Sequence, residues 1–265
     1  MPKGPEEYSP LEAEGKISLQ HLLTYQNPKI PEYQRLIDFV MKNGARRSLP
    51  QQFSRAWGDI LTHAGSAIDI QGSEIPKYNP PEYEKVRDYF KKKLFDQILV
   101  DVGGGGSNQV MRNLAKKFGV KTYINVDIAH GGKLAPHIAK HKEPQVNDFW
   151  QLPPEERTKP MDEYLVTADM LDFVARLPNN SCNFALNGIE LEVLSLGQPE
   201  LGTEYGKALF AEIVRATKVD GTIFGVESEI WDIDDQRLSE NLAEGLGLET
   251  EGWGKQFRVF EKIKE

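Results

Sequence analysis

The sequence predicts an α/β domain with a doubly wound, mostly parallel sheet. Residues 98–102 are a short apolar run, Ile-Leu-Val-Asp-Val, of the kind found in a strand buried on both faces of a parallel sheet. Four glycines follow at 103–106, and apolar residues at i, i+4 and i+8 then predict a helix. Further strand-like runs alternate with helical patterns, at 122–127, 164–168, 182–187 and 222–226. This alternation is typical of a doubly wound sheet.

Composition narrows the class of protein. The 265 residues are enough for one substantial core, and 40 acidic against 32 basic residues give a net charge of −8. That charge argues against nonspecific nucleic-acid binding as the main task. The single cysteine, Cys182, rules out an internal disulfide and suits a reducing compartment. No apolar segment is long enough to cross a bilayer, and residues 1–10 lack the apolar core of a signal peptide, so we expect a cytoplasmic protein.

The chain divides into an N-terminal extension, residues 1–95, and a main domain, residues 96–265. Helical spacing of apolar residues within 17–70 predicts that the extension is a helical cap. Its aromatic residues Tyr25 and Trp57 are candidates for lining a substrate pocket, and packing onto the main domain is the alternative. The tripeptide Asn-Pro-Pro at 79–81 indicates the start of another helix.

The glycine loop is the first candidate site. Ser107 is a suitable N-cap for the helix that follows, and a glycine loop before a helix N-terminus can bind an anionic or zwitterionic small molecule. The loop lacks the third glycine of the dinucleotide fingerprint G-x-G-x-x-G in either register. Asp101, Gly103 and Gly105 do form an acid-x-Gly-x-Gly motif.

Polar residues also follow the next three strands. Asp127 ends the second strand, close to the distance at which a carboxylate meets a ribose in Rossmann-like folds. Asp169 follows the third strand, and the loop 187–190 follows the fourth, at the edge where ligands bind in doubly wound sheets. His137 and His141 are spaced i, i+4 without a further ligand at a telling spacing, so we predict no metal site.

The C-terminal part continues the alternation. An amphipathic helix at 205–218 leads through a turn into the strand 222–226. A helix is expected around 234–245, and the strands 248–253 and 256–263 are expected to form a terminal hairpin.

Taken in order, these features resemble the Rossmann-like (class I) S-adenosylmethionine (SAM)-dependent methyltransferase family over residues 96–263. The resemblance implies a seven-stranded, mostly parallel sheet that closes with an antiparallel hairpin. Two positions depart from the family pattern: Ser107 stands where a third glycine is common, and Asn183 where an aspartate is usual. The first 95 residues carry no family pattern.

The resemblance also implies how SAM would bind. Its amino-acid end would lie at the glycine loop, Asp127 would bind the ribose, and Asp169 with the backbone of Met170 would read the adenine. Ile128 and Ile189 would cover the two faces of the adenine ring. The expected cofactor contacts are Asp101, Gly103, Gly105, Ser107, Asp127, Ile128, Asp169, Met170, Asn187 and Ile189.

The activity implied is methyl transfer to a small-molecule acceptor with an O, N or C nucleophile. A sulfonium methyl is already activated, so the protein contributes orientation, exclusion of water and, where needed, proton removal. Glu190 is the first candidate for a general base and His130 the second. The acidic composition and the helical extension favour a small acceptor over nucleic acid or protein. A homo-oligomer is compatible with the sequence.

Three other functions share parts of this pattern. A nicotinamide-dependent oxidoreductase would have the same strand, loop and ribose carboxylate, but its third glycine is missing here. An aminopropyltransferase would need an acidic motif after the fourth strand, where this chain has Asn-Gly-Ile-Glu at 187–190. A non-catalytic protein of the same fold would bind SAM without turnover.

Overall fold

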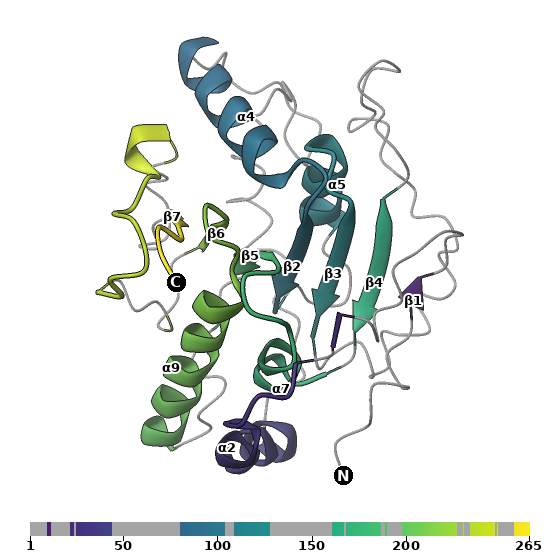
Figure 1. The fold of residues 1–265 in the computed structure, drawn as a ribbon, viewed down its shortest axis with the longest axis vertical. Coiled ribbons are helices and arrows are strands. Elements are labelled where there is room, and N and C mark those ends of the chain that lie inside the picture. Colours follow the sequence, from purple (N-terminus) through teal and green to yellow (C-terminus); the bar gives the residue numbers. More distant parts are fainter. Residues whose placement is uncertain are drawn as a thin grey trace.

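The computed structural model describes residues 10–11, 22–23, 25–43, 80–103, 109–127, 161–166, 168–186, 189, 198–226, 230, 234–246, 248 and 257–265. These residues form the layered α/β fold that the sequence predicts (Figure 1).

The sheet has the strand order β1-β4-β3-β2-β5-β6-β7. Its five parallel strands are β2 (Ile98–Val102), β3 (Thr122–Val126), β4 (Asp162–Val166), β5 (Asn183–Leu186) and β6 (Thr222–Val226). The chain proceeds from β2 outward through β3 to β4, and then returns to place β5 on the other side of β2. The sheet is therefore doubly wound, and its direction of winding changes between β2 and β5.

Antiparallel strands lie at both edges of the sheet. β7 (Phe257–Glu261) pairs with β6, which confirms the predicted antiparallel C-terminal strand. The first strand of the predicted hairpin, 248–253, falls outside the described residues except for the buried Leu248. At the other edge, β1 (Pro10–Leu11) pairs with β4, and nothing in the sequence pattern predicts it.

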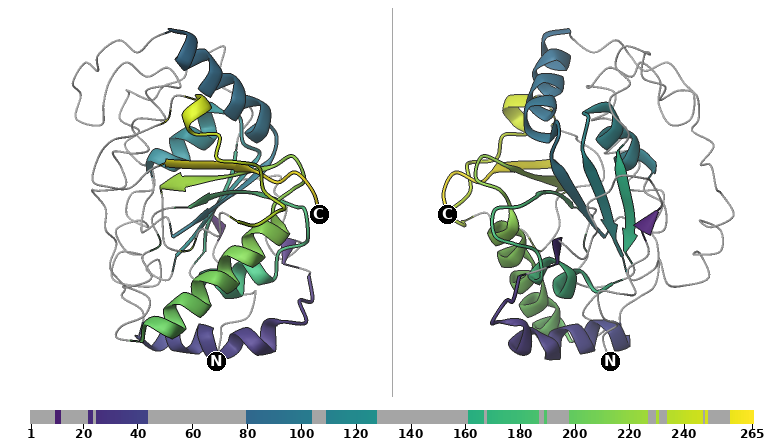
Figure 2. Two further views of the ribbon diagram at one scale, coloured as in Figure 1. Left: turned by 90° about the vertical axis from the view of Figure 1, so that its left-hand side faces the viewer. Right: turned by 45° about the vertical axis from the view of Figure 1, so that its right-hand side comes forward.

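Helices cover both faces of the sheet, as Figure 2 shows. One face carries α4 (Pro80–Leu94) and α5 (Gln109–Lys117), and the other carries α7 (Met170–Ala175) and α9 (Pro199–Ala216). Alternate residues of β2 enter different cores: Leu99 packs with α4 and α5, whereas Val100 and Val102 pack with α7 and α9. This accounts for the nearly continuous apolar run in the sequence, because a strand with two buried faces has no solvent-facing positions. None of the described helices combines the length and apolar character needed to cross a bilayer.

The two described helices of the N-terminal extension join these same cores. α2 (Ile30–Asn43) buries Tyr33, Leu36, Ile37 and Val40, at helical spacing, against α7 and α9. α4 buries Val86, Phe90 and Leu94 against the opposite face of the sheet. Helices on the N-terminal side of residue 95 therefore contribute to both cores of the main domain.

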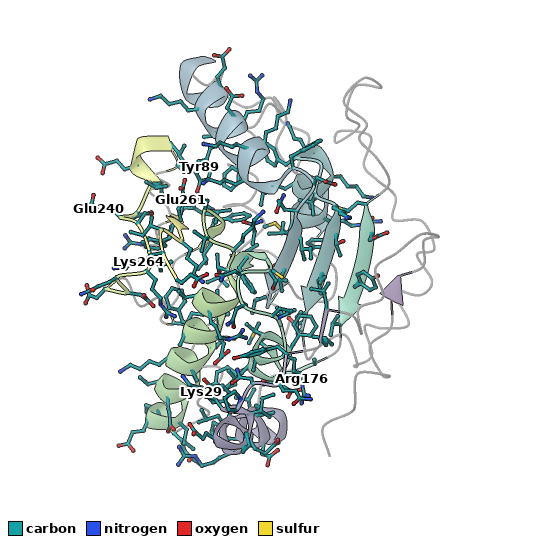
Figure 3. The ribbon with its side chains drawn as sticks, in the orientation of Figure 1. Lys29, Tyr89, Arg176, Glu240, Glu261 and Lys264 are labelled. Carbon is teal, nitrogen blue, oxygen red and sulfur yellow. The ribbon has the colours of Figure 1, made fainter. Side chains whose placement is uncertain are left out.

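Polar contacts fix α4 beside the C-terminal strands. The Tyr89 hydroxyl donates to Thr222 Oγ1 at 3.0 Å, and Lys93 Nζ lies 2.9 Å from Glu261 Oε2. Figure 3 shows Tyr89 and Glu261 lying between α4 and β7.

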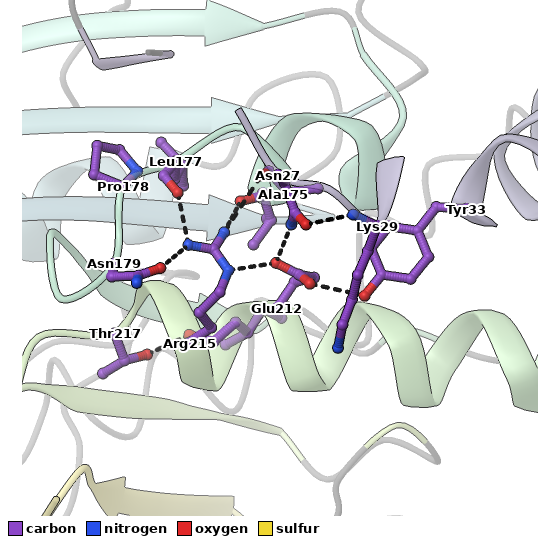
Figure 4. Close-up of polar contacts among 12 residues, drawn as sticks. Asn27, Lys29, Tyr33, Ala175, Leu177, Pro178, Asn179, Glu212, Arg215 and Thr217 are labelled. Carbon is purple, nitrogen blue, oxygen red and sulfur yellow. Dashed lines mark hydrogen bonds and ion pairs between the residues drawn. The ribbon is translucent and has the colours of Figure 1, made fainter. Parts of the chain in front are cut away.

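A buried cluster of polar side chains fixes α2 to α9 (Figure 4). The Glu212 carboxylate accepts from Asn27 Nδ2 at 2.9 Å, from the Tyr33 hydroxyl at 2.7 Å and from Arg215 Nε at 2.5 Å. Arg215 also donates to the carbonyls of Val174 and Leu177, near the C-terminal end of α7. One buried ion pair thus joins α2, α7 and α9.

The expected helix around 234–245 is wrong. The segment 234–243 consists of turns and extended backbone, followed by a single 3-10 turn, η5 (Glu244–Leu246). Its backbone runs beside β7: Ser239 N–H donates to the Glu261 carbonyl, and Leu242 N–H donates to the Val259 carbonyl. These hydrogen bonds cover the outer edge of β7, so pairing with an open strand edge outweighs the local helical pattern.

Asn183, which stands where the resemblance would place an aspartate, makes two hydrogen bonds. Asn183 Oδ1 accepts from Thr222 N–H at 2.8 Å, and its side-chain amide donates to the Lys93 carbonyl at 3.4 Å. The side-chain oxygen of Asn183 is therefore an acceptor at the start of β5, and its side-chain NH2 group is a donor to α4.

Candidate functional site

The turn after β2 requires a glycine at its first position. Gly103 has a φ of 75°, in the left-handed region, and its N–H donates to the Val126 carbonyl at 3.0 Å. A side chain at this φ would be strained. The turn therefore leaves the sheet sharply next to the end of β3, at the point where the winding changes. The other two residues of the expected loop contacts, Gly105 and Ser107, lie outside the described residues.

Asp101 is fully buried, on the face of the sheet covered by α5. Its Oδ2 accepts from the Tyr123 hydroxyl at 2.6 Å. Burial, followed by the neighbouring Asp101 carboxylate, raises the pKa of Tyr123 well above its usual range. The tyrosine is therefore a neutral donor to a buried carboxylate two residues before the turn.

Asp127 lies directly after β3 and is half-buried. Its N–H donates to the Val166 carbonyl at 3.0 Å, which places its backbone beside the last residue of β4. Asp127 and the turn at Gly103 are thus at the same edge of the sheet, at the ends of neighbouring strands.

Asp169, three residues beyond β4, is the N-cap of α7. Its Oδ1 accepts from Asp172 N–H at 3.0 Å, and its Oδ2 accepts from the Tyr205 hydroxyl at 2.9 Å. Only 4 % of Asp169 is exposed. Burial raises the pKa of Asp169 to about 7, because desolvation of the charged form outweighs the hydrogen bonds that stabilise it.

The structure thus brings together four of the predicted residues: Asp101, Gly103, Asp127 and Asp169. They lie at or just beyond the ends of the adjacent strands β2, β3 and β4. Met170, half-buried, begins α7 beside them and packs against the apolar core. Ile189 is a buried part of the same core.

Other predicted residues do not enter this group. Tyr25 packs its ring 4.4 Å from the Arg215 guanidinium, and its N–H donates to the Arg176 carbonyl at the C-cap of α7. Tyr25 thus lies at the C-terminal end of α7, whereas Asp169 caps the N-terminal end, and this position favours the packing alternative. The remaining predicted residues lie outside the described part of the chain: Trp57, Ile128, His130, Asn187 and Glu190.

Sequence reasoning missed the two tyrosines that bind the buried carboxylates. Tyr205 stands at i with Leu209 at i+4 and Ile213 at i+8, on the apolar face of a predicted helix. A tyrosine in such a position needs a partner for its hydroxyl, and that requirement was a usable signal. Tyr123 carries the same signal, because it lies in the middle of a strand buried on both faces.

The described residues bring no three histidine, cysteine, aspartate or glutamate side chains together in a metal-binding group. His137 and His141 lie outside them. The site as described is therefore a set of carboxylate acceptors around a glycine turn.

This arrangement defines the class of fold. The doubly wound sheet has five parallel strands, an antiparallel last strand beside β6 and an acid-x-Gly turn at the change of winding, which is the Rossmann-like arrangement that the sequence resemblance implies.

No protein-family model and no curated protein matches the sequence. Similar solved structures include an rRNA methylase from Streptococcus thermophilus, with 13% identity, 72% of this chain and 100% of that chain covered, and a TM-score of 0.38. Another is the ribosomal protein L11 methylase from Lactobacillus delbrueckii subsp. bulgaricus, with 11% identity, 74% and 84% covered, and a TM-score of 0.39. A third is phosphoethanolamine N-methyltransferase 2 from Haemonchus contortus, with 15% identity and a TM-score of 0.34; the match covers 72% of this chain and 35% of that one.

Proposed function

We propose that the protein is a SAM-dependent methyltransferase that acts on a small-molecule acceptor. The observation that carries the proposal is the position of Asp127 and Asp169 at neighbouring strand ends, next to the left-handed turn at Gly103. In doubly wound sheets a ligand binds at this edge, where the winding changes.

The residues present fit the proposed cofactor. Asp127 offers a half-exposed acceptor for the two ribose hydroxyls, which are both donors. Asp169 is an acceptor next to the N-terminus of α7, suited to the amino group of adenine. Gly103 presents no Cβ where the amino-acid end of the cofactor would approach the backbone. We propose Asp101, Gly105, Ser107, Ile128, Met170, Asn187 and Ile189 as the remaining contacts.

SAM, when bound, supplies a methyl group already activated for in-line attack. The chain then has to orient the acceptor, exclude water and, for an acceptor that must lose a proton, remove it. We propose Glu190 as the first candidate base and His130 as the second. The acidic net charge of −8 favours a small acceptor over a polyanionic one.

Titration calorimetry with S-adenosylhomocysteine tests the proposal. The wild-type protein is expected to bind, and Asp127→Ala is expected to weaken binding at least about tenfold, since each hydrogen bond to a charged group contributes about 1.5–3 kcal/mol. Asp162→Ala is the matched control, because Asp162 is a half-buried carboxylate at the opposite end of β4. Absence of binding by the wild type, or equal affinity in both variants, would contradict the proposal. Titration with NADH in the same assay tests the oxidoreductase alternative, which predicts that NADH binds.

A further inference from the structure

We infer that Tyr205 is a positioning residue whose hydroxyl holds Asp169 as an ionised hydrogen-bond acceptor for the cofactor. The inference rests on the proposed function, since it assumes that Asp169 binds the amino group of adenine. It concerns a residue of α9 that lies outside every motif of the sequence.

The hydroxyl of Tyr205 has its orientation fixed by two partners. Leu171 N–H donates to its oxygen at 3.3 Å, and its own proton is donated to Asp169 Oδ2 at 2.9 Å. Tyr205 is completely buried. A hydroxyl that already accepts from a backbone N–H directs its proton to the remaining acceptor, so Tyr205 acts towards Asp169 as a donor.

The hydrogen bonds that the Asp169 carboxyl group accepts favour its ionised form. Asp172 N–H donates to one oxygen and Tyr205 to the other, and a hydrogen bond from the Leu171 backbone also lowers the pKa of the carboxyl group. An ionised carboxylate has about four acceptor positions, so acceptor capacity remains for a ligand donor. A protonated carboxyl group would present an O–H towards the amino group of adenine, which is itself a donor.

The balance between these two forms falls near neutrality. Burial raises the pKa of Asp169 to about 7, and the hydrogen bond from Tyr205 acts in the opposite direction. Among the described residues, the charged groups near Asp169 are on α7: Asp172, which raises its pKa, and Arg176, which is paired with Asp172 at 2.7 Å. On α9 the facing group is Tyr205, whose own pKa burial raises well above its usual range.

The experiment measures the affinity for S-adenosylhomocysteine as a function of pH. In the wild type the affinity is expected to fall about tenfold from about pH 8 to about pH 6, as Asp169 becomes protonated. In Tyr205→Phe the pH midpoint of binding should rise by about one unit. The ionised carboxylate loses a hydrogen bond, and one pH unit corresponds to about 1.4 kcal/mol, the order of magnitude of such a bond. Asp169→Asn should remove the pH dependence, and the 6-oxo analogue S-inosylhomocysteine should show the opposite dependence in the wild type.

Tyr33→Phe is the matched control. It removes the same type of hydrogen bond, from a tyrosine hydroxyl to a buried carboxylate of α9, at 2.7 Å from Glu212. Tyr33 donates to Glu212 rather than to Asp169, so the pH midpoint of binding by Tyr33→Phe should equal that of the wild type. A merely structural effect of losing a buried hydroxyl would appear in both variants.

The outcomes separate the inference from the function on which it rests. If the wild type binds S-adenosylhomocysteine and Tyr205→Phe keeps the same midpoint, the inference is overturned and the proposed function stands. If the wild type does not bind at any pH, both are overturned. If Tyr205→Phe does not fold, ¹³C NMR of the wild type decides: the ring carbon bearing the Tyr205 hydroxyl should titrate with the carboxyl carbon of Asp169, and independent behaviour overturns the inference.

Discussion

Replacing Glu212 by alanine should destabilise the protein strongly. Its side chain is 3% exposed and accepts three hydrogen bonds, from Asn27, Tyr33 and Arg215. The substitution leaves the Arg215 guanidinium, 17% exposed, without its carboxylate partner, and it leaves two buried donors unpaired. Removing one member of a buried ion pair costs about 3–5 kcal/mol. In a chain of this size each kcal/mol lowers the melting temperature by about 2–4 °C, so a decrease on the order of 10 °C is expected.

Urea unfolding followed by circular dichroism measures this change, and Glu204→Ala is the control. Glu204 also joins α9 to α2, through Arg35 at 2.5 Å, but the two side chains are 51% and 65% exposed. Exposed pairs contribute between about 0 and 1 kcal/mol, so Glu204→Ala should be nearly neutral. The reasoning is refuted if the two variants lose the same stability, because burial would then not decide the contribution of a carboxylate between these helices.

Three further substitutions test the structure. Burial raises the pKa of Asp169 to about 7, so the folded protein binds a proton that the unfolded chain releases near pH 4. Its contribution to stability therefore falls as pH rises from about 4 to about 7, and Asp169→Asn should remove a pH dependence of about 4 kcal/mol, measured as urea midpoints across pH. Gly225→Ala should prevent folding, because its Cβ would lie 2.1 Å from the Leu186 carbonyl oxygen. In the control Gly245→Ala the new Cβ meets nothing within 4 Å, so this variant should fold normally. Soluble yield and melting temperature of the two variants test the prediction. Lys262→Met should cost about 2 kcal/mol in urea unfolding, because the three hydrogen bonds that the buried ammonium donates, to Asn180 Oδ1 and to the carbonyls of Arg215 and Thr217, would be lost.

The positions of the parallel strands were predictable from the sequence because each parallel strand carries its own signal. The run at 98–102 and the run at 122–126 are buried on both faces, and continuous apolar character is the direct consequence. β1 was not predictable, since a two-residue strand has no periodicity. The false helix at 234–245 shows the opposite limit: the local pattern was helical, but the open edge of β7 lay beside it in space.

The site was predictable to the extent that its residues follow strands directly. The position of Asp127 and Asp169 at one edge was predictable because strand ends in a parallel sheet meet there. Tyr205 was not found because its distance from Asp169 is 36 residues along the chain, and only packing of α9 on α7 brings the two together. The sequence left two alternatives open for Tyr25, a substrate pocket or packing, because an aromatic side chain in the sequence gives no indication of which edge of the sheet it reaches.

The two tyrosines explain how buried carboxylates can stand at this edge before a ligand arrives. A buried carboxylate without partners would be protonated or would destabilise the fold, because desolvation of a charge is costly. Asp101 receives the hydroxyl of Tyr123 from one face of the sheet, and Asp169 receives the hydroxyl of Tyr205 from the other. Each tyrosine is neutral, since burial raises its pKa, and each can donate only one proton. Such a donor stabilises the charged form of the carboxylate and leaves its negative charge in place. A lysine or arginine in the same place would neutralise that charge. The acceptor capacity that Asp169 keeps is what a ligand with an amino donor requires.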